Sequence, residues 1–262
     1  MPKVLFVGDI HGEFNRLVEP QQKHEPDLCF QVGDLEPVRD EEDLRELTGP
    51  AKYNEIRDFP DYYSGDKKIP CKTYFIGGNH EPWSYLHQHN PNCGNDSELI
   101  ANLNYLGRAG VTEIQRLTVA YLTGVYGETS YDVTSDKRVE FARGMNWKKN
   151  KRLGHFRKDE IARIVKQAKD REINILLTHC WPSPDELQNP PDWYSRNNYG
   201  IEVIGEIVEL IKPRYHVAGH IHSSYEGVYK KTDTRFIGLE KAPHQNDFRI
   251  MEFNIPKSEI KI

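Results

Sequence analysis

Five short apolar runs in this chain each end in residues that bind metal ions or transfer protons. Each run has the length of a β-strand, and aspartate, histidine or asparagine follows it within a few residues. The five polar ends are Gly8-Asp9-Ile10-His11, Gly33-Asp34, Gly77-Gly78-Asn79-His80-Glu81, His179 and Gly219-His220-Ile221-His222. Because open α/β sheets place function beyond the carboxyl ends of their strands, we expect these ends to meet at one site.

The combined residue types indicate a two-metal site for phosphoester hydrolysis. Two bridged metal ions lower the pKa of a bound water and clamp the phosphoryl oxygens. The expected ligands of one ion are Asp9, His11 and His222, and those of the other are Asn79, His179 and His220. Asp34 would bridge the ions, because a carboxylate has two oxygens to share. A mixed set of oxygen and imidazole ligands suits manganese, iron or zinc.

Two of these positions carry additional expectations. His80 follows a ligand directly and is free to act as the general acid, with a pKa near neutrality. His220 and His222 are two residues apart, so in extended backbone they would point the same way, and a small rotation would aim one at each ion. Each motif alone is more often a helix cap or a turn. The complete set in order favours a site.

Strand-like runs alternate with helical patterns, which is typical of an α/β protein. Apolar spacing predicts helices over 158–168 and 201–211, and further strands over 111–114, 117–125, 235–239 and 248–253. We expect residues 1–262 to form a single domain with loop insertions near 126–154 and 181–198. Long loops in compact domains are commonly functional, so these two are expected to contact the substrate.

Composition excludes several classes of protein. The 262 residues are 37% hydrophobic and 29% charged, as expected of a globular chain rather than a disordered or membrane one. No apolar run is long enough to span a bilayer. Cleavage of the first apolar stretch as a signal peptide would remove Asp9, so an intracellular location, cytoplasmic or nuclear, is expected. Four cysteines without a C-x-x-C pair suggest neither a zinc knuckle nor a disulfide framework.

The net charge of −5 leaves no overall electrostatic footprint for a nucleic acid. A basic stretch nevertheless lies between Lys137 and Lys158 and is interleaved with aromatic residues. Such a stretch could bind a phosphate backbone and stack bases, but charge runs are more often solvated loops.

The motifs resemble those of the calcineurin-like metallophosphoesterases, which implies a four-layer α/β/β/α sandwich of two packed mixed sheets flanked by helices. A finer resemblance is to the RNA lariat debranching enzymes. It covers roughly residues 3 to 240 and rests on 38–44, 62–68, 75–81, 104–111, 155–157, 178–182 and 212–215. It implies hydrolysis of a 2′,5′-phosphodiester at an RNA branch point, with an RNA or nucleotide substrate. Tentative substrate contacts are Arg39, His155, Arg157 and Trp181.

The chain departs from the debranching pattern at two residues. Asp9 stands where those enzymes typically have Cys, and Gly219 where they tend to have Ala. A hard carboxylate at residue 9 favours manganese or iron over zinc, and raises the chance of a different substrate. The sequence ends at Ile262, before the C-terminal region that usually follows in those enzymes.

Two alternatives remain open at this point. One is a phosphomonoesterase, including the protein serine/threonine phosphatases. Those enzymes look to have a phosphate-binding arginine where this chain has Gly78. The other is a non-catalytic scaffold that binds RNA or protein, although a binding role needs none of the seven ligands.

Overall fold

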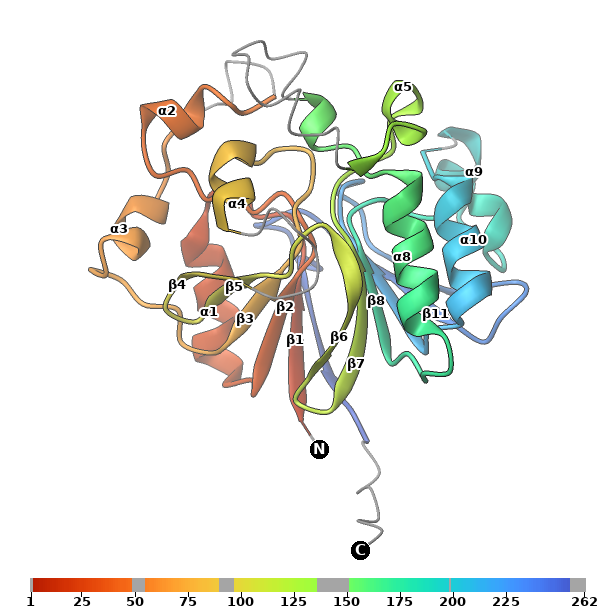
Figure 1. Ribbon diagram of the computed structural model, residues 1–262. Helices are drawn as coiled ribbons and strands as arrows, with labels where there is room; N and C mark the ends of the chain where they lie inside the picture. Colours follow the sequence, from red (N-terminus) through yellow and green to blue (C-terminus); the bar gives the residue numbers. More distant parts are fainter. Residues whose placement is uncertain (1, 49–54, 90–96, 136–150, 198, 255–262) are drawn as a thin grey trace, which may run out of the picture.

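Two mixed sheets lie face to face at the centre of the molecule, with helices on both outer faces (Figure 1). The structure is a computed structural model that describes residues 2–48, 55–89, 97–135, 151–197 and 199–254. In the described residues each sheet has six strands. The first sheet, in spatial order, contains β12 (Phe248–Glu252), β1 (Lys3–Val7), β2 (Leu28–Gln31), β3 (Thr73–Phe75), β5 (Leu103–Tyr105) and β4 (Ser97–Ile100).

The second sheet repeats this plan. Its order is β10 (Tyr225–Val228), β11 (Arg235–Gly238), β9 (Tyr215–Ala218), β8 (Ile175–Thr178), β7 (Leu117–Leu122) and β6 (Ala109–Ile114). In each sheet the four inner strands are parallel and the edge strands are antiparallel to them. The carboxyl ends of β1, β2, β3, β8 and β9 therefore share one edge of the molecule, which positions the expected ligands.

Alternation along the strands produces three apolar layers. Val4 and Phe6 of β1 face the second sheet, whereas Leu5 and Val7 face α1. Successive strand residues point to opposite faces, so one run can serve both layers. The middle layer joins β1, β2 and β3 to β7, β8 and β9 across the sheet interface. Burial of both sheet faces explains why these strands read as continuous apolar runs.

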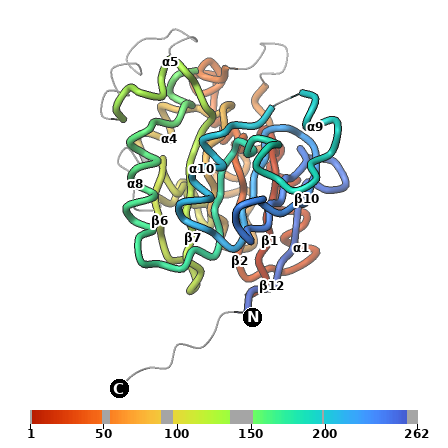
Figure 2. Tube along the Cα trace, turned by 90° about the vertical axis from the view of Figure 1, so that its right-hand side faces the viewer, coloured from red at the N-terminus to blue at the C-terminus, as the bar shows by residue number. Residues whose placement is uncertain are grey.

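Helices close the two outer layers. Along the first sheet lie α1 (Phe14–His24), α2 (Glu41–Leu44), α3 (Phe59–Tyr63) and α4 (Trp83–His89). On the second side lie α5 (Glu128–Tyr131), α8 (Lys158–Ala168), the short 3-10 helix η3 (Pro184–Glu186), α9 (Asp192–Asn197) and α10 (Glu202–Ile211). Figure 2 looks onto the α8 and α10 face. Ile161 and Ile164 of α8 and Ile204 and Val208 of α10 are buried against the second sheet. The predicted four-layer α/β/β/α fold is confirmed.

Part of the expected insertions falls outside the structure. Residues 136–150 of the first insertion, which carry most of the basic stretch, lie outside the described residues. The rest of that insertion contains α5, and the second contains η3 and α9. The expectation of a single domain stays a prediction. Within the described ranges, no helix is long and apolar enough to cross a lipid bilayer.

Candidate metal centre

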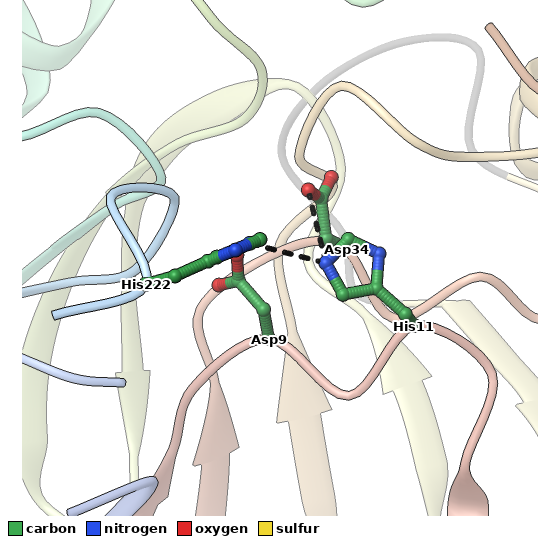
Figure 3. A group of neighbouring side chains, drawn as sticks. All are labelled: Asp9, His11, Asp34 and His222. Carbon is green, nitrogen blue, oxygen red and sulfur yellow. Dashed lines mark hydrogen bonds and ion pairs between the residues drawn. The ribbon is translucent and has the colours of Figure 1, made fainter. Parts of the chain in front are cut away.

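The loops that follow β1, β2 and β9 bring four potential ligands together. Atoms of Asp9, His11, Asp34 and His222 lie within 4.8 Å of one another, and the four side chains converge (Figure 3). Nε2 of His222 is 3.1 Å from Oδ2 of Asp9 and 3.2 Å from Nε2 of His11. This is the group expected for the first ion, with Asp34 included.

A second group adjoins the first. It contains Asp34, His179 and His220, again within 4.8 Å. Nδ1 of His179 donates to the carbonyl of Val32 at 2.9 Å, so Nε2 is the nitrogen that could bind an ion. Among the described residues, neither Nε2 of His179 nor Oδ1 of Asn79 has a hydrogen-bond partner, although both atoms are buried. Buried polar atoms are normally satisfied, so the lone oxygen of Asn79 and a nitrogen of His179 that has only an oxygen of Asp34 near it, at 3.3 Å, fit a bound cation.

Asp34 belongs to both groups, and its two oxygens have different surroundings. Oδ1 accepts the backbone N–H groups of Asn79 at 2.7 Å and His80 at 2.8 Å. Oδ2 lies 3.3 Å from Nε2 of His179 and 4.0 Å from Nε2 of His11. We expected the carboxylate to divide its oxygens between two ions. In the structure a single oxygen, Oδ2, faces both groups, because backbone hydrogen bonds occupy the other.

The ligand loops are held in an unusual backbone conformation. His11, Asp34, Glu36, His220 and His222 all have φ between 45° and 72°, in the left-handed region. Side chains disfavour that region, and such strain concentrates at functional sites. His220 and His222 therefore do not lie in extended backbone, as the sequence reasoning assumed. They follow β9 in a tight turn, yet each still joins a different ligand group.

Buried carboxylates make the centre strongly negative. Burial would lower the pKa of His179, but Asp34 and Asp9 overcome this and raise it to about 9. Burial would likewise raise the pKa of Asp34, but His179 holds it well below its usual range. Burial and the neighbouring His179 lower the pKa of His220 to about 4, so this imidazole is neutral and able to bind metal. The field that protonates His179 would equally attract a cation.

Two glycines allow the ligands to approach the backbone. A Cβ at Gly78 would lie 2.1 Å from Oδ1 of Asp34 and 2.7 Å from Nε2 of His179. A Cβ at Gly219 would lie 2.2 Å from Oδ1 of Asp9, whose carboxylate accepts the N–H of His220 at 3.0 Å. These contacts are shorter than van der Waals distance. Close packing around the carboxylates therefore requires glycine at both positions.

Sequence reasoning assigned no role to two acidic residues that support the ligand loops. Glu81 is fully buried and accepts N–H groups of Leu35, Glu36 and Gly78 at 2.9–3.1 Å, which ties the β2 loop to the β3 loop. Burial, with the nearby Asp34, raises its pKa to about 8. Glu36 contacts His11 and lies near His80, and these three also form a close group. The signal available was position, because Glu36 stands two residues after Asp34 as His11 does after Asp9.

Other residues of the protein engage three of the four tentative substrate residues. Arg39 forms a bidentate ion pair with Asp43, at 2.7 and 2.8 Å. Arg157 is fully buried and donates to the carbonyls of Arg152 and His155. Trp181 is also fully buried and packs edge to face against Phe236 in the outer layer of the second sheet. Their assignment to the substrate stays a prediction, and the structure buries Arg157 and Trp181 away from solvent.

His155, the fourth of these residues, lines a pocket of about 430 Å³ beside the metal centre. Asn79 and His220 form the metal-centre end of this pocket, while Tyr126, Lys151 and Tyr199 contribute to its walls. Burial, with the nearby Arg157, lowers the pKa of His155 to about 4, so it is neutral near pH 7. The pocket joins the first expected insertion, through Tyr126 and Lys151, to the second ligand group, and Tyr199 lies just beyond the second insertion.

Curated proteins and solved structures include relatives that are similar to this chain over nearly its whole length. A lariat debranching enzyme from Caenorhabditis elegans is 28% identical over 285 residues, which are 97% of this chain and 55% of the relative. One from Homo sapiens is 30% identical over 277 residues, 95% of this chain and 49% of the relative. The chain thus spans about half the length of these curated relatives. One solved crystal structure matches 97% of the chain with a TM-score of 0.59 and 15% identity, which shows the fold alone.

The family model for calcineurin-like phosphoesterases matches residues 2–224. This range contains all five ligand loops and both ligand groups. The resemblance expected from the sequence is confirmed, and the chain belongs to the calcineurin-like phosphoesterase family.

Proposed function

We propose that the chain is a dinuclear-metal phosphodiesterase whose substrate class is a 2′,5′-linked RNA branch. The observation that carries the proposal is Oδ2 of Asp34, which faces two separate groups of ligand atoms. When bound, two divalent cations supply a water of lowered pKa and neutralise charge on the phosphoryl oxygens. The oxygen and imidazole ligands favour manganese or iron, and zinc is the third option.

The chain's own residues perform the remaining tasks. Asp9, His11 and His222 would hold one ion, and Asn79, His179 and His220 the other, with Asp34 between them. His80 would protonate the leaving oxygen, because its side chain is 25% exposed at the edge of the centre and no ligand role is assigned to it. The backbone N–H of His80 is fixed by Oδ1 of Asp34, which sets the position of this acid relative to the ions.

A diester is favoured over a monoester by charge and by space. A monoester dianion requires a positive clamp, yet any side chain at residue 78 would collide with Asp34. Arg39 is committed to Asp43. The pocket beside Asn79 and His220 offers about 430 Å³, enough for one substituent of a diester. The debranching relatives support RNA as the source of that substituent.

The decisive experiment compares four substrates with manganese. They are a branched 2′,5′ RNA, a linear 3′,5′ RNA, methyl nitrophenyl phosphate and nitrophenyl phosphate. We expect hydrolysis of the branched RNA and the aryl diester, and slow or no hydrolysis of the monoester. Faster hydrolysis of the monoester would replace the proposal with a phosphomonoesterase. If neither the branched RNA nor methyl nitrophenyl phosphate is hydrolysed, with manganese confirmed bound, the proposed phosphodiesterase activity is wrong.

A histidine variant separates an enzyme from a binding scaffold. His80→Ala should lower turnover of the branched RNA by about 10² or more while manganese binding stays. The matched control is His24→Ala, at the carboxyl end of α1 and remote from the ligand loops, which should change neither quantity. RNA binding by both variants without hydrolysis by the wild type would favour the scaffold.

A further inference from the structure

Glu36 lies between two histidines to which the proposed function gives different tasks. Its Oε1 is 2.6 Å from Nδ1 of His11 and 3.8 Å from Nδ1 of His80. The two imidazole rings lie edge to face, with centroids 5.4 Å apart. One carboxylate oxygen therefore faces the Nδ1 edge of both rings, and both Nε2 atoms remain available for other partners.

The glutamate itself is fixed in place. Its side chain is only 10% exposed, and its backbone N–H donates to Oε2 of Glu81 at 2.9 Å. Its φ of 53° lies in the left-handed region, which a glutamate adopts only when its surroundings determine the conformation. The carboxylate is thus held in position before any substrate or ion arrives.

We propose that Glu36 is a positioning residue shared by the first metal site and the general acid. It accepts Nδ1–H of His11, so that Nε2 of His11 points into the ligand group of Asp9 and His222. It also accepts Nδ1–H of His80, so that the proton on Nε2 of His80 faces the substrate. The inference rests on the proposed function, because only that function assigns these tasks to the two histidines.

The proton balance is simple. Hydroxide supplies the oxygen that forms the new bond to phosphorus, the bond between phosphorus and the leaving oxygen breaks, and that oxygen takes the Nε2 proton of His80. The imidazolium becomes a neutral imidazole whose Nδ1–H remains with Glu36. The 3.8 Å separation from His80 is longer than a hydrogen bond, as is common for catalytic contacts before substrate is bound. Contacts of this kind to a metal-ligating histidine typically change metal affinity by 10- to 100-fold when removed.

Charge at residue 36 can be removed with little change in shape. Glu36→Gln keeps one acceptor but lacks the negative charge that strengthens both Nδ1–H contacts. The matched control is Glu46→Gln, which makes the same chemical change in a carboxylate that accepts the N–H of Ser84 at 2.7 Å. Thermal unfolding of both variants records any loss of stability.

The first readout is manganese affinity, which requires no turnover. Titration followed by electron paramagnetic resonance should show that Glu36→Gln lowers the affinity for one of the two manganese ions by about tenfold or more. Glu46→Gln should leave both ions unchanged. Unchanged manganese affinity in Glu36→Gln would overturn the contact with His11. This readout stays valid even if the wild type hydrolyses no diester, in which case the proposed function fails separately.

The second readout is leaving-group dependence. A 2′,5′-linked dinucleotide releases a ribose hydroxyl that needs a proton, whereas a nucleoside nitrophenyl phosphate releases an anion that does not. Glu36→Gln should lower turnover of the first by about 10²-fold and of the second by about tenfold or less. In a His80→Ala background this difference between substrates should disappear. Equal losses on both substrates, or a difference that persists without His80, would overturn the contact with His80.

A second variant covers the event that Glu36→Gln does not fold. Glu36→Asp keeps the charge on a shorter side chain, so we expect it to lose less turnover on the 2′,5′-linked dinucleotide than Glu36→Ala. An equal or larger loss in Glu36→Asp would mean that the charge at residue 36 does not act on His80, and would overturn that contact.

Discussion

The residues of the metal centre could be predicted from the sequence, whereas the residues expected to contact the substrate were predicted less well. The seven expected ligands and His80 lie at one edge of the two sheets. Apart from Asn79, the expected ligands form two groups, and Asp34 belongs to both. Of the four expected substrate residues, Arg157 contacts His155, whereas Arg39 pairs with Asp43 and Trp181 packs against Phe236. Only His155 lines the pocket beside the centre, while Arg157 and Trp181 are buried in the scaffold.

The contrast has a physical cause. Metal ligands must be particular residue types within a few ångströms of one point, and strand ends provide that geometry directly. Contacts to an organic substrate can come from many residue types on irregular loops, so they leave no comparable pattern. Large aromatic and basic side chains in such loops also pack, as Trp181 does, and packing produces the same sequence signal.

The largest effect is expected at Gly78, where the centre tolerates no side chain. Gly78→Ala would place a Cβ 2.1 Å from Asp34 and 2.7 Å from His179, so both must move. We expect weaker binding of the second manganese ion and a loss of at least about 10²-fold in turnover. The control is Gly65→Ala, whose Cβ would meet no described atom within 4 Å; its φ of +88° strains the backbone, so it should lower stability but leave manganese binding unchanged. Normal manganese binding by Gly78→Ala would show that the centre is looser than described.

The next largest effect is expected at Trp181, which either contacts the substrate or only packs in the protein interior. Removal of a fully buried tryptophan should lower the free energy of unfolding by about 3–5 kcal/mol in Trp181→Ala. The folded fraction should keep its KM for RNA. Chemical denaturation and steady-state kinetics together decide between the two regions. A raised KM for RNA at unchanged stability would show instead that Trp181 contacts the substrate.

His216 offers a test within the scaffold behind His179. Its Nε2 donates to Thr178 Oγ1 and its Nδ1 accepts from Tyr229, each at 2.7 Å, which suits a neutral ring. Burial lowers its pKa to about 3, so between its unfolded value near 6.5 and pH 3 the unfolded state binds the extra proton. Stability should therefore fall as pH drops below about 6.5, by about 1.4 kcal/mol per pH unit from this residue.

The measurement is urea denaturation from pH 7 to 4 in wild type and His216→Gln. The unfolding free energy of the variant should depend less steeply on pH, by the equivalent of about one bound proton, even though the variant is less stable at pH 7. Identical slopes would mean that His216 is solvated or already charged in the native protein.

The smallest effect is expected at the pocket. Tyr199 is 57% exposed at its wall, so Tyr199→Ala should raise KM for a nucleotide diester by about tenfold, as loss of one base-stacking contact would. KM for methyl nitrophenyl phosphate should hardly change. Tyr63→Ala, an exposed tyrosine of α3, is the control. Equal effects on both substrates would exclude the pocket as a nucleotide site.

The sequence predicted the scaffold well where packing follows simple periodicity. The expected helix at 158–168 has the observed bounds of α8, and the expected stripe at 201–211 corresponds to α10. The short strands β4, β5 and β10 were missed, because polar residues or glycine interrupt their three or four positions and leave no apolar run. Helices α1 to α4 were also not predicted. Their buried faces are set by the first sheet, which supplies contacts that no local pattern records.

The same limit applies within the metal centre. Residue type and position predicted Asp34 as the shared ligand, but not which oxygen faces both groups. That depends on the N–H groups of Asn79 and His80, which come from another loop. Glu36 and Glu81 were given no role because their partners are far away along the chain. Left-handed turns at His220 and His222 replaced the extended backbone that was expected.

The central claim is that one carboxylate, Asp34, is shared by two cations. Electron paramagnetic resonance of the wild type titrated with manganese tests this most directly. We predict two ions per chain with the exchange-coupled spectrum of a bridged pair, and loss of that coupling in Asp34→Asn. Two uncoupled ions in the wild type, or a single ion at saturation, would contradict the account.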